Sequence, residues 1–115
     1  MNFIPITLDN NKFSINGINF ELDNEILAKL NGKSELIVGI RSENMVKGET
    51  SITAVTDIVE MNGGEKTVYF NLNDAKCSAK IDLNYNVDGN VELKLSVKDM
   101  YFFDSLTEEN LLYIV

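Results

Sequence analysis

Apolar and polar residues alternate along most of this chain, and a period of two residues predicts β-strands. A first strand is predicted from Phe3 to Leu8, and after a polar turn the alternation continues through residues 12–22. The pair Asn16-Gly17 interrupts this second stretch. Asn-Gly tolerates the positive φ angles of a type I′ turn, so residues 12–22 are predicted to form a β-hairpin.

One segment departs from this alternation and has helical spacing instead. Residues 23–30 place their apolar side chains on one face of a helix, and Asp23 is a residue type that caps helix N-termini. The pair Asn31-Gly32 then provides a stop signal. The chain is therefore predicted to contain one short helix, about two turns long, that depends on tertiary packing.

The rest of the chain predicts a series of further strands. Residues 35–40 form a nearly continuous apolar run, which is typical of a buried strand. Residues 50–60 are rich in β-branched side chains, and the segment is long enough to bend across two sheets. Additional strands are predicted at 67–72, 77–81 and 91–97, residues 98–104 are predicted to form a turn with an aromatic cluster, and residues 111–115 a short strand or tail.

Short strands, one short helix and frequent Gly and Asn turns predict an all-β fold with a minor α component, as a barrel or a sandwich. A chain of 115 residues can enclose one hydrophobic core. We therefore predict a single domain over residues 1–115. A break at Lys47-Gly48 would divide it into sub-lobes of about 1–47 and 48–115, each too small for a stable core of its own.

Charge and composition exclude several classes of function. The chain has 18 acidic and 10 basic side chains, a net charge of −8, and Arg41 is its only arginine. Binding of nucleic acid depends on basic residues that neutralise phosphates, so neither nucleic acid nor an anionic membrane surface is an expected partner. No apolar stretch approaches the ~20 residues of a membrane span, so no membrane insertion is expected. Cys77 is the only cysteine, which suits a reducing compartment such as the cytosol.

Few residues are available for catalysis or metal binding. The chain has no histidine, so a Ser-His or Cys-His nucleophile pair is excluded and the usual zinc ligands are missing. Residues 82–89 alternate oxygen-bearing side chains as a calcium loop does. Their glycine stands at the eighth position of such a loop instead of the sixth, and Leu93 replaces the acid at the twelfth, so a polar connection is the favoured interpretation. We predict no enzyme activity, no cofactor and no metal site. An enzyme with a carboxylate pair would need two acids facing each other in a pocket.

Four stretches carry recognisable motifs, in order along the chain. The first is Met-Asn-Phe-Ile at 1–4, the second Leu-Ile-Val-Gly-Ile-Arg-Ser-Glu-Asn-Met at 36–45, the third the Val-Glu-x-x-Gly-x-Glu pattern within 55–70, and the last Met-Tyr-Phe-Phe-Asp at 100–104. Together they resemble the MNF, LGIRPEH, VxxVExxGxExxVY and LHLFD segments of ABC-importer ATPases of the maltose, glycerol-phosphate and polyamine type. Ser42 and Asn44 depart from the Pro and His that are usual in the second motif. The matching positions, expected to have structural or interface roles, are Gly39, Arg41, Glu43, Glu60, Gly63, Glu65, Phe103 and Asp104.

The resemblance implies the fold and the role of a transport-associated (TOBE) domain, an OB-like β-barrel of short antiparallel strands that follows the ATPase domain. Because the chain lacks a P-loop, a Walker B strand and a signature motif, it would be a non-catalytic regulatory and dimerisation domain of an importer of sugars or related solutes. Its implied partners are its own ATPase domain, a second copy of the subunit and, in some members, a regulatory protein. The implied location is the cytoplasmic face of the cell membrane.

The same group of barrels suggests an alternative function. Related transport-associated barrels bind small oxyanions such as molybdate through backbone N–H groups and Ser or Lys side chains. Ser34, Gly63 and Gly64 offer such groups here, but the net charge of −8 opposes the capture of an anion.

Overall fold

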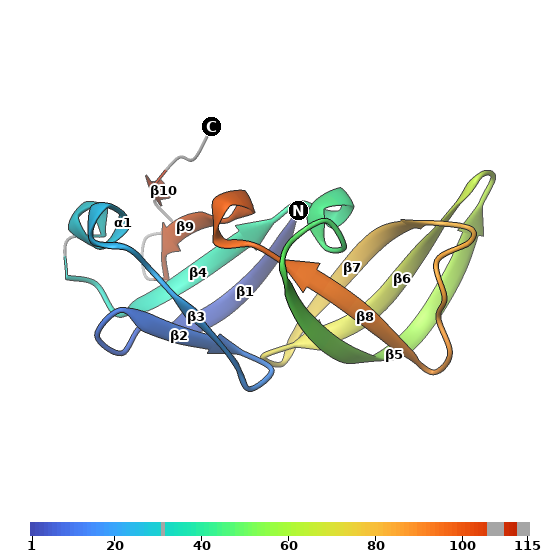
Figure 1. Cartoon of the computed structure of the whole chain (residues 1–115), viewed down its shortest axis with the longest axis horizontal. Coiled ribbons are helices and arrows are strands. Elements are labelled where there is room, and N and C mark those ends of the chain that lie inside the picture. The colour runs from blue at the N-terminus through green and yellow to red at the C-terminus, as the bar shows by residue number, and fades with distance from the viewer. Residues whose placement is uncertain (31, 106–109, 113–115) are drawn as a thin grey trace.

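A computed structural model describes residues 1–30, 32–105 and 110–112 of the chain (Figure 1). Nearly all of its regular structure is β. In chain order the elements are β1 (Asn2–Thr7), β2 (Lys12–Ile15), β3 (Ile18–Glu21), α1 (Asn24–Lys29), β4 (Glu35–Ile40), the 3₁₀ turn η1 (Ser42–Asn44), β5 (Thr50–Asn62), β6 (Glu65–Leu72), β7 (Ala75–Asp82), β8 (Asn90–Leu95), the 3₁₀ turn η2 (Val97–Asp99), β9 (Tyr101–Asp104) and β10 (Asn110–Leu112).

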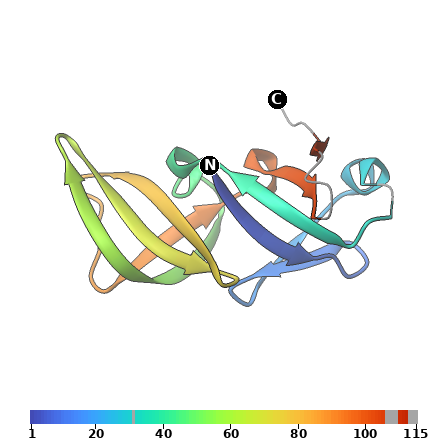
Figure 2. The same ribbon diagram turned by 180° about the vertical axis from the view of Figure 1, so that it is seen from behind.

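These strands form antiparallel sheets in two lobes that lie side by side along the long axis of the molecule, which measures 42 × 24 × 23 Å (Figures 1 and 2). The first lobe contains a sheet in the order β1-β4-β9-β10, the hairpin β2-β3 and the helix α1. The second lobe is a sheet in the order β7-β6-β5-β8. The predicted all-β class with antiparallel strands and one short helix is confirmed, and the arrangement is consistent with an OB-like domain.

The predicted hairpin and helix are both present, and the turn and cap residues that predict them occupy the expected positions. Asn16 and Gly17 have φ angles of 50° and 82°, so this pair makes the tight turn between β2 and β3. The carboxylate of Asp23 accepts a hydrogen bond of 2.9 Å from the Ile26 N–H and caps α1. The helix then ends at Leu30, which is buried in the core.

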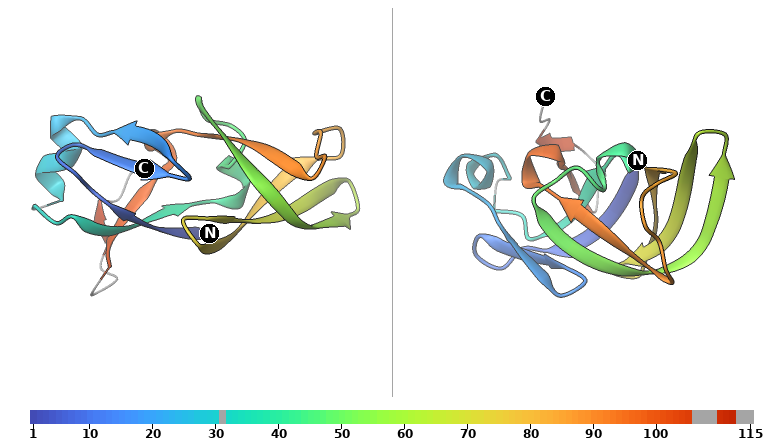
Figure 3. Two further views of the ribbon diagram at one scale, coloured as in Figure 1. Left: turned by 90° about the horizontal axis from the view of Figure 1, so that it is seen from below. Right: turned by 45° about the vertical axis from the view of Figure 1, so that its right-hand side comes forward.

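β5 bends across two pairing partners, as its length predicted. Residues 50–55 pair with β8, residues 56–62 pair with β6, and the register shifts between Thr56 and Ile58. Because the strand changes partner along its length, β5 curves strongly and ends in a β5–β6 hairpin that stands away from the rest of the lobe (Figure 3).

Two predictions for the last third of the chain are wrong. The strand predicted at 91–97 ends at Leu95, and Val97 begins η2. The predicted aromatic turn at 98–104 contains a strand instead, since residues 101–104 pair with β4 and join the first lobe. The strands therefore do not separate at a single cut near residue 47. The predicted end strand corresponds to β10, while residues 113–115 lie outside the described part of the chain.

The two lobes are joined by asparagine side chains that bond to backbone groups. Asn16 and Asn73, each in a turn with positive φ, exchange hydrogen bonds: the N–H of Asn16 donates to Asn73 Oδ1 (2.9 Å) and the N–H of Asn73 donates to Asn16 Oδ1 (3.0 Å). Asn73 Nδ2 also donates to the carbonyl oxygens of Pro5 and Ser14. At the other end of β1, Asn2 exchanges two hydrogen bonds with the backbone of Ser78. These contacts satisfy polar groups where the sheets meet.

Alternate strand residues from both lobes form one continuous hydrophobic core. Phe102 of β9 is fully buried, and its ring meets the edge of the Phe13 ring with the two centroids 6.1 Å apart. Cys77 packs in the second lobe beside Ala79 and Ile81 as a small buried apolar residue.

Burial raises the pKa of the Cys77 thiol from 9.0 to about 11, which predicts a loss of stability at alkaline pH. The folded state retains the thiol proton longer than the unfolded state does. This contribution to stability is therefore complete below pH 9 and is lost as the pH rises through about 11. Urea unfolding at intervals across this range should show a steeper decline for the wild type than for Cys77→Ala. Because the pKa values of Tyr69 and Tyr85 are also raised, only this difference between the two proteins reports on Cys77, and parallel declines would contradict the prediction.

Candidate functional site

The sheet formed by β1, β4 and β9 is apolar on both of its faces. Its inner face carries core residues such as Ile4, Val38 and Phe102. On the opposite face, Phe3 lies across from Gly39, which in turn lies across from Tyr101. Phe3 is 53% exposed, although a strand residue of this kind is usually buried. The exposed Phe3 makes this face the candidate contact surface of the first lobe.

Gly39 and Phe103, two of the motif positions, meet on this exposed face. A Cβ atom at Gly39 would lie 2.9 Å from Cε2 of Phe103 and 2.9 Å from the sulfur of Met1, so glycine leaves the space that these side chains occupy. The Phe103 ring also packs edge-on against Phe3, with centroids 5.8 Å apart. We call this surface the aromatic face; it consists of Met1, Phe3, Pro5, Ile37, Tyr101 and Phe103.

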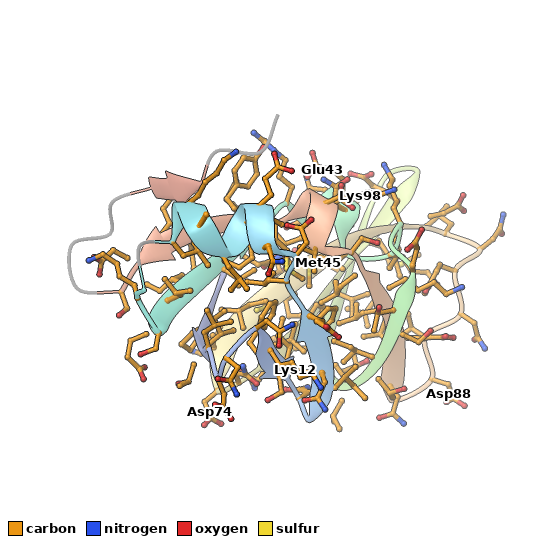
Figure 4. The ribbon with its side chains drawn as sticks, turned by 60° about the vertical axis from the view of Figure 1, so that its left-hand side comes forward. Lys12, Glu43, Met45, Asp74, Asp88 and Lys98 are labelled. Atoms are coloured by element: carbon orange, nitrogen blue, oxygen red, sulfur yellow. The ribbon has the colours of Figure 1, made fainter. Side chains whose placement is uncertain are left out.

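Arg41 and Glu43 lie where the two lobes meet. β4 ends at Ile40, Arg41 is the N-cap residue of the η1 turn, and Glu43 lies within that turn. Glu43 points outward at the edge of the molecule (Figure 4). A hydrogen bond from its own backbone holds the pKa of Glu43 below its usual value. Slight burial opposes this effect, and the nearby charges of Arg41, Lys80 and Lys47 lower the pKa further.

The neighbouring hydrogen bond supports a structural role for this turn. Ser42 Oγ and Ser78 Oγ lie 3.0 Å apart, which ties η1 to β7 in the second lobe. Met45, at the end of the turn, is fully buried. The Arg-x-Glu motif thus stands at the connection between the lobes and not in a pocket.

Glu60, Gly63 and Glu65 occupy the far end of the β5–β6 hairpin. Gly63 has a φ of 65°, which explains why glycine occupies this turn. Glu60 lies on the same side as Tyr69, where its negative charge and a hydrogen bond raise the pKa of the tyrosine. We call residues 55–66 the hairpin tip. Its apolar side chains Val55, Ile58, Val59 and Met61 are between 40% and 74% exposed.

Asp104 has a structural environment that sequence reasoning missed. Its carboxylate is almost wholly buried, and Oδ2 forms a salt bridge of 2.5 Å with Nζ of Lys33. Lys33 belongs to the loop before β4, 71 positions away in the sequence, so no local pattern could have identified the pair. A buried charge requires compensation, and the Lys33 ammonium group provides part of it for the Asp104 carboxylate.

The alternative sites receive no support from this geometry. In the calcium-like segment, Asp82 Oδ1 accepts a hydrogen bond of 2.9 Å from the Asn84 N–H, and the Tyr85 hydroxyl donates to the carbonyl of Glu92. Throughout the part of the chain that the structure describes, no three His, Cys, Asp or Glu side chains are grouped to hold a metal ion. The proposed oxyanion donors are separated: Ser34 precedes β4 in the first lobe, whereas Gly63 and Gly64 lie at the hairpin tip of the second. Within the same described ranges, no helix is long and apolar enough to cross a membrane.

Two curated proteins are similar to this chain along most of its length. The ABC transporter ATP-binding protein YcjV of Escherichia coli O6:H1 (strain CFT073) is 27% identical over 117 residues, which covers 94% of this chain. The corresponding protein of E. coli strain K12 is 26% identical over the same share. These matches support a relationship with ABC transporter ATP-binding proteins. No family model matches the chain.

The share of each protein that the match covers is also informative. The chain spans about a third of the length of these relatives, 32%. A match over nearly all of this chain and a minor part of the relative is compatible with a segment that is not itself the ATPase. The relationship supports a role associated with a transporter ATPase.

Proposed function

We propose that residues 1–115 form a TOBE-type regulatory and dimerisation domain of an ABC-importer ATPase subunit that serves uptake of a sugar or a related solute. The observation that supports this most directly is the match along 94% of the chain to 32% of an ABC transporter ATP-binding protein. The domain performs no ATP chemistry. Its partners are the ATPase part of its own subunit and a second copy of that subunit, at the cytoplasmic side of the membrane.

The aromatic face is the surface we assign to the dimer contact. It combines an exposed Phe3 with partly buried Tyr101 and Phe103. Aromatic residues are enriched at the centres of protein interfaces, and charged residues are depleted there. A contact that persists while the ATPase parts open and close keeps their effective concentration high, so the subunits rotate relative to each other without dissociating.

The proposal predicts that Phe3→Ser weakens dimerisation of the complete ATPase subunit by at least about tenfold, since truncation of an aromatic side chain at an interface hot spot typically costs about 2 kcal/mol or more. Sedimentation velocity over a concentration series measures this change. Ile18→Ser is the matched control, because Ile18 is also exposed but lies on the β2–β3 hairpin.

A subunit from which residues 1–115 are deleted provides the second comparison. We expect it to be monomeric at concentrations where the complete subunit is dimeric. Dimerisation of equal strength with and without the domain would overturn the proposal.

A further inference from the structure

We propose that the outer edge of β5, residues 58–62, is a docking site to which a partner protein adds an extended segment of alternating apolar and basic residues. This site lies in the second lobe, away from the aromatic face, and the inference is independent of the proposed dimer contact. Figures 1 and 3 show the β5–β6 hairpin standing out from the body of the lobe.

The first observation is the exposure of apolar side chains on both faces of the hairpin tip. Val59 lies across from the buried Val68, whereas Ile58 lies across from Tyr69 on the other face. Met61 shares a face with Val59. Of the eight large hydrophobic residues that are exposed among those the structure describes, four lie between positions 55 and 61. Packing against the core does not explain why apolar side chains occupy either face of the hairpin tip. Their presence there requires another explanation.

The second observation is a strand edge without a neighbour. β8 accompanies β5 only from Thr50 to Val55, and the Thr56 N–H donates to the carbonyl of Gly89. Among the residues that the structure describes, only those of β6 pair with the segment from Ile58 to Asn62, and they do so on one side. The register shift before Ile58 turns this part of β5 away from β8. An open edge presents backbone N–H and C=O groups that an extended segment satisfies by joining the sheet.

The third observation is that this segment is paired with β6 along its whole length. The pairs from Ile58–Tyr69 to Asn62–Glu65 hold it in register, and β6 pairs in turn with β7 out to Glu65–Asp82. Asn62 Nδ2 donates to Thr67 Oγ1 (3.1 Å), and Lys66 Nζ donates to the Tyr85 carbonyl (3.2 Å). A partner strand thus meets a preorganised template, and binding requires little further ordering of this chain.

The acidic side chains of the hairpin tip favour a basic partner strand over a second copy of this chain. Asp57, Glu60 and Glu65 surround the apolar residues of the edge, and the single lysine of the tip is engaged with the Tyr85 carbonyl. Glu60 is the central residue of the segment 58–62. Symmetric antiparallel pairing with a second copy would place Glu60 opposite Glu60, and like charges directly across from each other are destabilising. A partner strand with Lys or Arg at alternate positions instead complements these acids.

Synthetic peptides test the proposal with the chain as it is. The probe is an acetylated and amidated peptide of alternating Lys and Val, compared with a Glu-Val peptide, a Lys-Ser peptide and a Lys-Val peptide whose central Val residues are replaced by Pro. Proline removes the N–H groups that strand addition needs and leaves the charge unchanged. Binding is followed by NMR amide shifts and by hydrogen exchange of residues 58–62.

We expect the Lys-Val peptide to bind at least about tenfold more tightly than the other three, with slowed exchange at the amides of residues 58–62 that do not bond to β6. The double variant Ile58→Ser with Met61→Ser should abolish the preference for the Lys-Val peptide. The variant Glu60→Lys should instead prefer the Glu-Val peptide. The control variant Ile18→Ser should retain the preference for the Lys-Val peptide. Equal binding of the proline peptide, shifts centred on the aromatic face, or sedimentation that shows β5-edge pairing with a second copy would each overturn the proposal.

Discussion

Phe102→Ala is expected to lower the free energy of unfolding by about 3–5 kcal/mol, a large part of the total stability of a domain of this size. Phe102 is fully buried in the middle of β9, across from Val38, and it contacts the ring of Phe13. Removal of the ring leaves a cavity between the sheet and the β2–β3 hairpin. The surrounding strands are fixed by their ladders and relax into such a cavity only in part.

The matched control is Phe103→Ala, one residue further along the same strand. Phe103 belongs to the aromatic face and is only partly buried, so its truncation should cost about 1 kcal/mol. Urea unfolding followed by circular dichroism measures both values. If Phe103→Ala proved as damaging as Phe102→Ala, the inner and outer faces of β9 would be assigned incorrectly.

Gly48→Ala is expected to be comparably harmful, at about 3 kcal/mol, although it adds a single methyl group. A Cβ atom at Gly48 would lie 2.3 Å from the carbonyl carbon of Leu95 and 2.5 Å from the nitrogen of Ser96. Both are backbone atoms, so no rotation of a side chain relieves the overlap. The Gly48 N–H also donates to the Lys94 carbonyl at 2.7 Å, and a shift of the segment that avoids the overlap breaks this bond.

Gly64→Ala provides the comparison for this prediction. No atom lies within 4 Å of a Cβ built at Gly64, and its φ is not positive, so this variant should change the unfolding free energy by less than about 0.5 kcal/mol. Both variants are measured by thermal and urea unfolding. A Gly48→Ala variant with the stability of the wild type would mean that the 45–48 segment does not cross the end of β8 as described.

Gly48 also illustrates how far local sequence patterns extend. The Lys47-Gly48 pair predicts a break in the chain between sub-lobes. The reason for glycine is a close approach to the backbone of Leu95 and Ser96, which lie almost fifty positions later. Likewise, Asn16 belongs to the predicted Asn-Gly turn, but its exchange of hydrogen bonds with Asn73 depends on two hairpins meeting in space.

For the candidate surfaces, the sequence supplied the residues but not their grouping. The motif positions suggested a set of structural or interface roles, and the fold distributes them over four places: Gly39 and Phe103 on the aromatic face, Arg41 and Glu43 between the lobes, Glu60, Gly63 and Glu65 at the hairpin tip, and Asp104 beside Lys33. No sequence pattern predicts the exposed edge of β5. The alternation of apolar and polar residues in a strand is the same whether or not another strand pairs with it.

By itself, the sequence determined the all-β class, most strand positions, the Asn-Gly hairpin, the capped helix and the bend of β5. These depend on residue spacing and on turn chemistry, which act over a few neighbouring residues. Only the tertiary structure decided that residues 101–104 return to β4, that Asp104 reaches Lys33 and that β5 ends in an open edge. Each of these is a contact or a missing contact between distant segments, and such pairings are set by packing of the whole chain, which no local pattern records.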